Sequence, residues 1–170
     1  QRDAVTRLGL DPFDLTGETH RMHALQLADP KAAEVFDPKA WKRIKDRARE
    51  IQIEVKPPVP KALKATLRPY QIEGFHFLAY LATNRFGGLL ADDMGLGKTI
   101  QALALLLERA EQGPSLVVAP ASVVRNWRAE ITRFCPTLTP LIFGPGDRQK
   151  QIEELKPFDI LLCSYGLLPP

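Results

Sequence analysis

The sequence is poor in cysteine, and this shortage excludes a protein held together by a disulfide framework. Cys135 and Cys163 are the two cysteines, and they form no Cys-x-x-Cys pair. Each lies in an apolar stretch, so we expect both thiols to be reduced and buried in a core. The three histidines, His20, His23 and His76, have no spacing that joins them to the cysteines. This argues against a zinc site and leaves open only a contribution from His20 and His23.

The sequence also lacks a long apolar run and a strong excess of charge. Its longest apolar candidate, 102–107, is bounded by Gln101 and Glu108, so we expect no membrane span, and we find no signal peptide. The net charge of +3 comes from 23 basic and 20 acidic residues, which permits a local nucleic-acid patch without requiring one. With 45% hydrophobic residues, the chain can bury one sizeable core.

The most informative stretch is 92–99, which reads Asp-Asp-Met-Gly-Leu-Gly-Lys-Thr between an apolar run and a helical pattern. A strand that ends in a glycine-rich turn and feeds a helix aims backbone N–H groups and the positive helix dipole at one point. Gly95 and Gly97 allow close approach of phosphate oxygens. Lys98 can reach the β and γ phosphates, and the Thr99 hydroxyl can ligate Mg²⁺. We therefore expect a phosphate-binding loop for ATP or GTP.

This loop matches a looser form of the strict pattern Gly-x-x-x-x-Gly-Lys-Thr, because Asp92 stands where the first glycine would be. The alternative is an ordinary strand-to-helix turn with incidental glycines. Strand, loop, lysine, hydroxyl and helix follow one another in the right order, and this favours the phosphate loop.

The first part of the chain predicts a helical N-terminal extension, 1–55. Asp29-Pro30 and Asp37-Pro38 each place a capping carboxylate before a proline, so short helices should begin there. The second helix has an apolar stripe and a strongly basic remainder. It is either a solvated surface above a buried seam, which we favour, or a phosphate-contacting face.

A Pro-rich linker, 56–65, should follow as an extended connector. Beyond this boundary Pro69 opens a predicted helix that ends near Thr83, with Tyr70, Phe77, Leu78 and Leu81 as core contacts.

The remainder alternates between apolar strands and helices, which predicts the α/β class. A parallel sheet with helices on both faces should result, and ligands gather at the carboxyl ends of such strands. That edge should hold the phosphate loop, 120–122 and 164–165. The predicted strands are 86–91, 115–119, 138–143 and 158–163, and the predicted helices are 99–111, 123–134 and 147–155.

Several motifs together resemble the Snf2 family of superfamily 2 helicase-like ATPases. They are Leu-Arg-Pro-Tyr-Gln at 67–71 with Gly74, the stretch 87–101 that contains the phosphate loop, Val-Ala-Pro-Ala-Ser at 118–122 with Trp127 and Glu130, and the strand with its Ser-Tyr pair at 159–165. The resemblance implies that 66–170 is the N-terminal part of a RecA-like P-loop ATP-binding lobe. In that family the acidic Mg-binding box lies further on, so we expect this chain to be truncated before it.

The resemblance also implies roles for single residues, with ATP and Mg²⁺ as cofactors. Lys98 and Thr99 would be catalytic, and Thr99 would be the metal ligand. Gln71 would read the N6 and N7 edge of adenine, although by itself it resembles a helix-surface residue. Asp93 replaces the glutamate that is more usual in the family, and it keeps the charge. The implied cofactor-binding residues are Arg68, Gln71, Asp93, Met94, Gly95, Leu96, Gly97, Lys98, Thr99 and Ile100.

Four residues would contact DNA if the family's pattern holds: Ser122, Arg125, Ser164 and Tyr165. Ser122 should also cap the helix that follows it, and capping alone would explain its presence. Ser164 and Tyr165 could equally be a turn hydroxyl and a packed aromatic. Trp127 should be a packing residue that orients its helix.

The implied function is an ATPase that couples hydrolysis to translocation on double-stranded DNA and remodels DNA-bound protein complexes. These 170 residues should bind nucleotide without turning it over, because they contain neither an acidic box nor an identifiable arginine finger. The alternatives are a strand-separating helicase and a non-hydrolysing ATP-sensing or scaffold module, with a small-molecule kinase far behind. We expect a bacterial protein at the nucleoid, with the nucleus as the alternative. The sequence predicts no oligomeric state.

Overall fold

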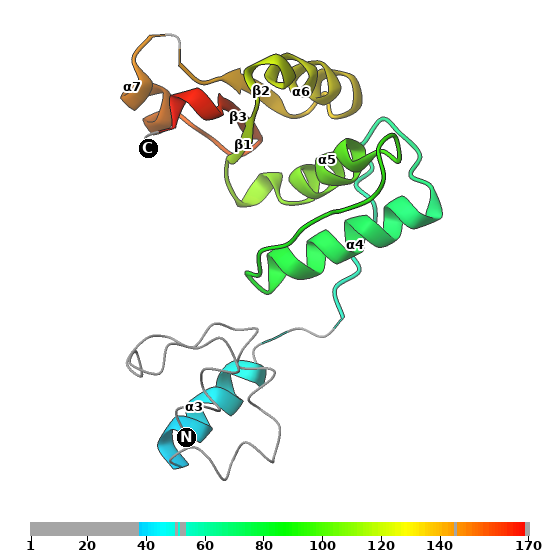
Figure 1. Cartoon of the computed structure of the whole chain (residues 1–170), viewed down its shortest axis with the longest axis vertical. Coiled ribbons are helices and arrows are strands. Elements are labelled where there is room, and N and C mark those ends of the chain that lie inside the picture. The colour runs from blue at the N-terminus through cyan, green and yellow to red at the C-terminus, as the bar shows by residue number, and fades with distance from the viewer. Residues whose placement is uncertain (1–37, 50, 52–53, 145, 169–170) are drawn as a thin grey trace. The chain divides into compact units, whose positions relative to one another are not determined.

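The computed structural model describes residues 38–49, 51, 54–144 and 146–168. The chain divides into two compact units, and we describe each by itself. The helical unit comprises 1–55 and 80–88, and the sheet unit comprises 56–79 and 89–170. The long helix α4 (Pro69–Thr83) contributes to both units (Figure 1).

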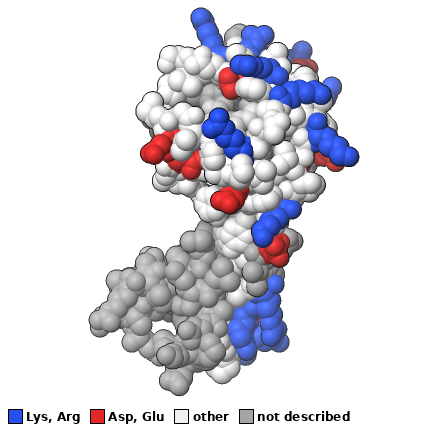
Figure 2. All heavy atoms as spheres, turned by 90° about the vertical axis from the view of Figure 1, so that its right-hand side faces the viewer, with Lys and Arg blue, Asp and Glu red and all other residues white. Residues whose placement is uncertain are grey.

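The helical unit contains α3 (Pro38–Arg49), which begins at the second predicted Asp-Pro pair. The pair at Asp29-Pro30 lies outside the described residues. Lysine and arginine side chains gather on this unit (Figure 2), and Lys45 Nζ lies 5.6 Å from the centroid of the Trp41 ring. Ile51 is buried with Leu81 and Phe86 in a small cluster. A buried seam beneath a solvated basic face fits these contacts, and the alternative of a phosphate-contacting face stays open.

Helix α4 begins at Pro69, as predicted, because the fixed φ of proline suits the first helical position. Its buried residues in the sheet unit are Gln71, Phe75 and Ala79, which recur every four residues and form one stripe. The prediction that Phe77 is a core contact was wrong, since this side chain is 45% exposed. Phe77 is two residues from Phe75, and that spacing places it on another face of the helix.

The predicted strand 86–91 is also absent, because these residues have no secondary structure. Among the described residues the only sheet is built from other segments, so this stretch has no ladder to complete. Leu89 is 81% exposed as a result. The expectation that sheet pairing places the phosphate loop at the carboxyl edge fails for the same reason.

The remaining elements alternate as the sequence predicts, with boundaries shifted by a few residues. They are α5 (Lys98–Glu108), η2 (Ala110–Gln112), β1 (Ser115–Ala119), α6 (Ala121–Phe134), β2 (Thr139–Ile142), α7 (Arg148–Glu153), β3 (Asp159–Ser164) and η3 (Tyr165–Leu167). The strand order is β1-β3-β2, and both pairings are parallel. The last strand therefore lies in the middle of the sheet, and the predicted α/β class with a parallel sheet is confirmed.

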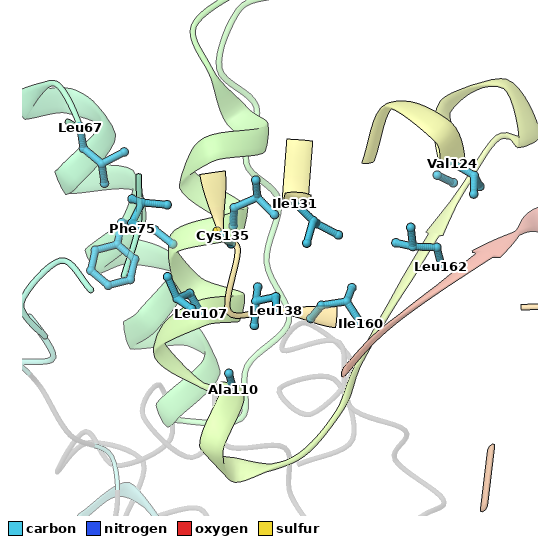
Figure 3. Packing of buried hydrophobic residues seen from close by; sticks show 14 residues of the cluster. Leu67, Phe75, Leu107, Ala110, Val124, Ile131, Cys135, Leu138, Ile160 and Leu162 are labelled. Carbon is cyan, nitrogen blue, oxygen red and sulfur yellow. The ribbon is translucent and has the colours of Figure 1, made fainter. Parts of the chain in front are cut away.

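The core of the sheet unit joins α4, α5, α6 and β3 (Figure 3). Phe75, Leu103 and Ile131 are each 0% exposed, and they represent three different helices. The four central residues of β3 are all buried, whereas β2 is largely exposed. Cys135 and Cys163 are free and buried, as expected.

The Pro-rich segment leads into α4 along the sheet unit, and we call 56–68 the strap. Leu63 and Leu67 are buried in the main core. The Lys64 N–H donates to Phe134 O at 2.7 Å, at the end of α6. His76 Nε2 lies 3.1 Å from Pro57 O, which joins α4 to the start of the strap. The strap is thus packed against the sheet unit along much of its length, while the domain division at 56–65 stays a prediction.

Candidate nucleotide-binding site

A hollow of about 650 Å³ opens in the sheet unit where the strap, α4, the phosphate loop and α6 meet. Its walls carry backbone N–H groups, an ammonium group, a hydroxyl, an amide and a carboxylate. The lining residues are Ala65, Thr66, Arg68, Tyr70, Gln71, Met94, Gly95, Gly97, Lys98, Thr99, Ile100, Glu130 and Phe134.

The N-terminus of α5 faces this hollow without a side-chain cap. Its N-cap residue is Gly97, in the left-handed region with φ 79° and ψ 42°. Among the described residues, the N–H groups of Lys98, Thr99 and Ile100 donate to no acceptor. Such free donors at the positive end of a helix favour an anion.

Lys98 folds back onto its own loop in this structure. Its Nζ donates to Asp92 O at 2.6 Å and to Asp93 O at 2.9 Å. The Thr99 hydroxyl has no hydrogen-bond partner in the described part of the chain. An ammonium held only by carbonyls and a free hydroxyl are both available to a phosphate and its metal ion.

Gln71 connects α4 to the phosphate loop. Its Oε1 accepts from the Arg68 N–H at 2.9 Å, and its Nε2 donates to Leu96 O at 3.0 Å. The first bond is half of a capping box, which explains a glutamine at this helix start. Tyr70 OH donates to Leu96 O as well, at 3.1 Å. Gln71 is therefore buried, at 9% exposed, and the reading of it as a surface residue is wrong.

The Gln71 amide also explains why position 97 is a glycine. A Cβ built on Gly97 would lie 2.6 Å from Gln71 Nε2, and the backbone has the positive φ that L side chains rarely adopt. A side chain at this position would push the amide away from the loop. The close approach of α4 to the loop depends on the absence of that side chain.

The chain matches the family model of the SNF2-related domain over residues 70–169. The chain belongs to the SNF2-related family. The match begins one residue before Gln71 and includes the phosphate loop, α6 and β3, which are the stretches that carry the resemblance.

The relatives' names concern chromatin remodelling and helicase activity. The chain is 44% identical over 124 residues to the chromatin-remodeling ATPase INO80 of Arabidopsis thaliana, with 64% of this chain covered. It is 41% identical over 120 residues to the helicase SWR1 of Eremothecium gossypii, with 65% covered. The chain spans about 8% of the length of each of these two relatives.

Two solved SNF2-related structures share its fold. The SWI2/SNF2 ATPase core of Sulfolobus solfataricus in complex with double-stranded DNA has a TM-score of 0.55 and 38% identity, over 69% of this chain and 24% of that one. The ATPase core domain of the same organism has a TM-score of 0.57 and 43% identity, over 64% and 23%.

The SNF2-related chain brings most of its predicted cofactor residues into one hollow. Arg68, Gln71, Lys98 and Thr99 line it with Met94, Gly95, Gly97 and Ile100. Asp93 and Leu96 do not line it, and they contribute carbonyls that accept from Lys98 and Gln71. The roles of these residues stay predictions.

The sequence reasoning missed several wall residues of the hollow. Tyr70 is next to Gln71 and could have been found from its place in the same motif. Glu130 was noted only as part of the resemblance. Ala65, Thr66 and Phe134 carry no signal of their own, because only the packing of the strap on α6 brings them to this wall.

The predicted DNA residues lie elsewhere in the sheet unit. Ala119 pairs with Ser164, so Ser122, just after β1, and Tyr165, just after β3, follow the same edge of the sheet. Arg125 is exposed, and Tyr165 is 61% exposed. Lysine and arginine side chains are spread over this unit in Figure 2 rather than gathered in one stripe.

The prediction that Ser122 caps α6 was wrong. The N-cap residue is Pro120, and no side chain caps this helix. The helix begins one residue after Pro120, because the extended backbone of that proline leads directly into Ala121. Ser122 thus lies inside the first turn, and Trp127 packs half-buried against the main core, as expected.

The described residues hold no group of three or more His, Cys, Asp or Glu side chains that could bind a metal ion. His20 and His23 lie outside them. Burial raises the pKa of the Cys135 thiol from 9.0 to about 11, so the thiol stays protonated near neutral pH. No helix in the described part is long and apolar enough to cross a membrane.

Proposed function

We propose that this chain is the nucleotide-binding part of an ATPase that couples ATP hydrolysis to translocation on double-stranded DNA. The observation that carries the proposal is the convergence of an amide, an ammonium group, a free hydroxyl and an uncapped helix N-terminus in one hollow. The residues that supply them are Gln71, Lys98 and Thr99 at the start of α4 and α5.

The hollow fits ATP with Mg²⁺ in its chemistry. Lys98 and the free N–H groups of α5 would hold the phosphates, and the Thr99 hydroxyl would be a ligand of the metal ion. Gln71 keeps one amide hydrogen without a short partner and a second lone pair on Oε1, which suits the N6 and N7 edge of adenine. Bound Mg-ATP would supply the transferable phosphoryl group, and these residues would bind and orient it.

We propose double-stranded DNA as the macromolecular partner. The proposal is supported by the SWI2/SNF2 ATPase core of Sulfolobus solfataricus, whose structure was solved in complex with double-stranded DNA. Ser122, Arg125, Ser164 and Tyr165 would contribute contacts along the edge of the sheet. A remodelled protein–DNA complex is the expected target, because relatives are chromatin-remodeling ATPases.

The site of action would be chromosomal DNA. Named relatives from plants and fungi favour the nucleus over our first expectation of a bacterial nucleoid.

A strand-separating helicase is the second candidate, and it is favoured by one observation, the name of the relative helicase SWR1. The two activities differ in what a motor does to the duplex. Displacement of a third strand from a triplex requires movement along the duplex, whereas release of one strand from a duplex requires separation. Both assays on one preparation would separate the candidates.

The first test is steady-state ATP hydrolysis by the full-length protein that carries these residues, with and without double-stranded DNA. We expect DNA to stimulate turnover, and Lys98→Ala to abolish the stimulated rate. The chain of 170 residues should bind ATP without hydrolysing it, since its sequence contains no acidic box. ATP binding without turnover on any nucleic acid in the full-length protein would favour an ATP-sensing or scaffold module instead.

A further inference from the structure

Asp92 places a carboxylate at the position where the strict phosphate loop has its first glycine. A negative charge on such a loop would repel the phosphates of a nucleotide. The structure shows where this charge lies, since Asp92 Oδ2 accepts a hydrogen bond from Gln101 Nε2 at 2.9 Å. Asp92 does not line the hollow. The carboxylate is thus bound to α5, outside the walls where the phosphates would bind.

Gln101 is a polar residue at a fully buried position of α5. It lies one turn after Lys98 on α5 and is 0% exposed. Its Oε1 is buried and has no hydrogen-bond partner among the described residues, and a buried polar atom without a partner is rare in a folded protein. If the amide were turned round, Gln101 Oε1 would lie 2.9 Å from Asp92 Oδ2, and two acceptors would face each other. The carboxylate therefore fixes the amide nitrogen as the atom that points to Asp92.

Gly74 of α4 makes the room for this amide. A Cβ built on Gly74 would lie 1.8 Å from Gln101 Oε1 and 2.9 Å from Gln101 Cδ. The two helices therefore leave space for an amide at this point, and its N–H group is directed to Asp92. An apolar side chain would fill the same space and leave no oxygen without a partner. What glutamine adds here is the amide N–H group that donates to Asp92.

The contact continues to the lysine of the loop. The same Asp92 whose carboxylate Gln101 holds offers its backbone carbonyl to Lys98 Nζ at 2.6 Å. Gln101, Asp92 and Lys98 thus form one chain of contacts. A change at Gln101 would release the Asp92 side chain. The Asp92 carbonyl that accepts from Lys98 Nζ would then also be able to move.

We propose that Gln101 is a positioning residue for the nucleotide site. It would hold the Asp92 carboxylate away from the phosphates and fix the Asp92 carbonyl that accepts a hydrogen bond from Lys98. The proposal rests on the proposed nucleotide site. It explains how this chain uses an acidic residue where a glycine would otherwise stand.

The test removes the donor and then the charge that it holds. In Gln101→Met, which matches the side-chain length without an amide, the Asp92 carboxylate loses its donor, and we expect the affinity for inorganic triphosphate to fall at least about tenfold. The affinity for adenosine should stay unchanged, because the contact acts at the phosphate end. Combining it with Asp92→Asn removes the charge that was released, which should restore triphosphate binding to within about threefold.

The measurements are displacement titrations of a fluorescent ATP analogue from the 170-residue chain, with folding checked by circular dichroism. Gln112→Met is the matched control, since Gln112 is exposed and follows α5 in η2. Should Gln101→Met not fold, Gln101→Leu removes the same amide. It should also weaken triphosphate and leave adenosine unchanged.

A Gln101 variant that binds triphosphate as the control does would overturn the proposal, and so would a loss that Asp92→Asn fails to restore. Equal losses for adenosine and triphosphate would show a general disruption and overturn it as well. If the unaltered chain binds no triphosphate, or if Lys98→Ala binds as well as the unaltered chain, the nucleotide site itself is wrong, and the role of Gln101 falls with it.

Discussion

At the residue scale, the phosphate loop is held in place by its own neighbours. Lys98 rests on two backbone carbonyls, and Leu96 O accepts from both Tyr70 and Gln71. Entry of a triphosphate would exchange neutral carbonyl partners of Lys98 for charged phosphate oxygens, and charge-assisted hydrogen bonds are the stronger kind. These hydrogen bonds hold the loop in place and leave the N-terminus of α5 without a side-chain cap beside the hollow.

Removal of the lysine tests the anion site directly. We expect Lys98→Ala to weaken binding of a fluorescent ATP analogue at least about tenfold, because the phosphates lose the ammonium group at the N-terminus of α5. The free energy of unfolding should fall by less than about 1 kcal/mol, since only two hydrogen bonds to carbonyls are lost. Lys156→Ala, at an exposed lysine, is the control. Unchanged affinity in Lys98→Ala would contradict the phosphate-loop assignment.

Gln71 should act at the other end of the nucleotide. In Gln71→Ala we expect the affinity for ATP to fall more than the affinity for inorganic triphosphate, because the base loses its amide partner. A smaller loss for triphosphate is expected, since Leu96 O also loses a donor. Competition titrations with both ligands measure the difference, with Gln112→Ala as control. Equal losses for the two ligands would remove the adenine role.

At the element scale, helix α4 connects the site to the core. Its buried stripe carries Gln71 at the hollow and Phe75 in the packed interior. One face of the helix therefore reaches the hollow at its first turn and the core further along. The exposed Phe77 lies outside this face.

The two phenylalanines of α4 give a matched pair for this interpretation. Phe75→Ala should lower the free energy of unfolding by about 3–5 kcal/mol, because a fully buried aromatic leaves a cavity. Phe77→Ala should cost less than about 1 kcal/mol, since the side chain is already 45% exposed. Urea unfolding followed by circular dichroism measures both. Equal costs would mean that the face of α4 is assigned incorrectly.

At the scale of the whole molecule, the strap and α6 complete the sheet unit around the site. Lys64 binds the end of α6 at Phe134 O, and Cys135, the next residue, is 0% exposed. The strap, the end of α6 and the main core thus meet at one place. A charge introduced there would act on the stability of the unit as a whole.

The Cys135 thiol supplies such a charge at alkaline pH. Burial raises its pKa from 9.0 to about 11, so the unfolded chain loses this proton at a lower pH than the folded chain does. Stability should be unaffected below pH 9 and should decrease between about pH 9 and 11, by up to about 2–3 kcal/mol. Urea unfolding across this range should show a flatter dependence in Cys135→Ala. An identical slope in both proteins would contradict the assignment.

Much of the fold and the site followed from local patterns. The phosphate loop was predicted because glycines, lysine and threonine stand in order before a helix, and α4 was predicted from a proline with an apolar run behind it. The class of the sheet was predicted because strands and helices alternate. These are signals that each segment carries in its own residues.

The predictions that were wrong depend on which other segments a stretch of chain packs or pairs with, and its own residues do not encode this. The run 86–91 has the composition of a strand and no neighbour to pair with among the described residues. Phe75 and Phe77 are equally apolar, and only the packing of the main core selects the first. Ser122 is a residue type that often caps helices. The helix nevertheless begins at Ala121, directly after Pro120, so Ser122 lies inside it.

The sequence by itself thus determined the family, the glycine-rich loop before α5 and the order of helices and strands, because these depend on residues close together along the chain. The tertiary structure alone decided that the strap and Phe134 form a wall of the hollow, that Gln71 contacts the loop, and that Gln101 binds Asp92 beside Gly74. Those contacts join residues from separate helices and loops, and their distances follow from packing, which no local pattern encodes.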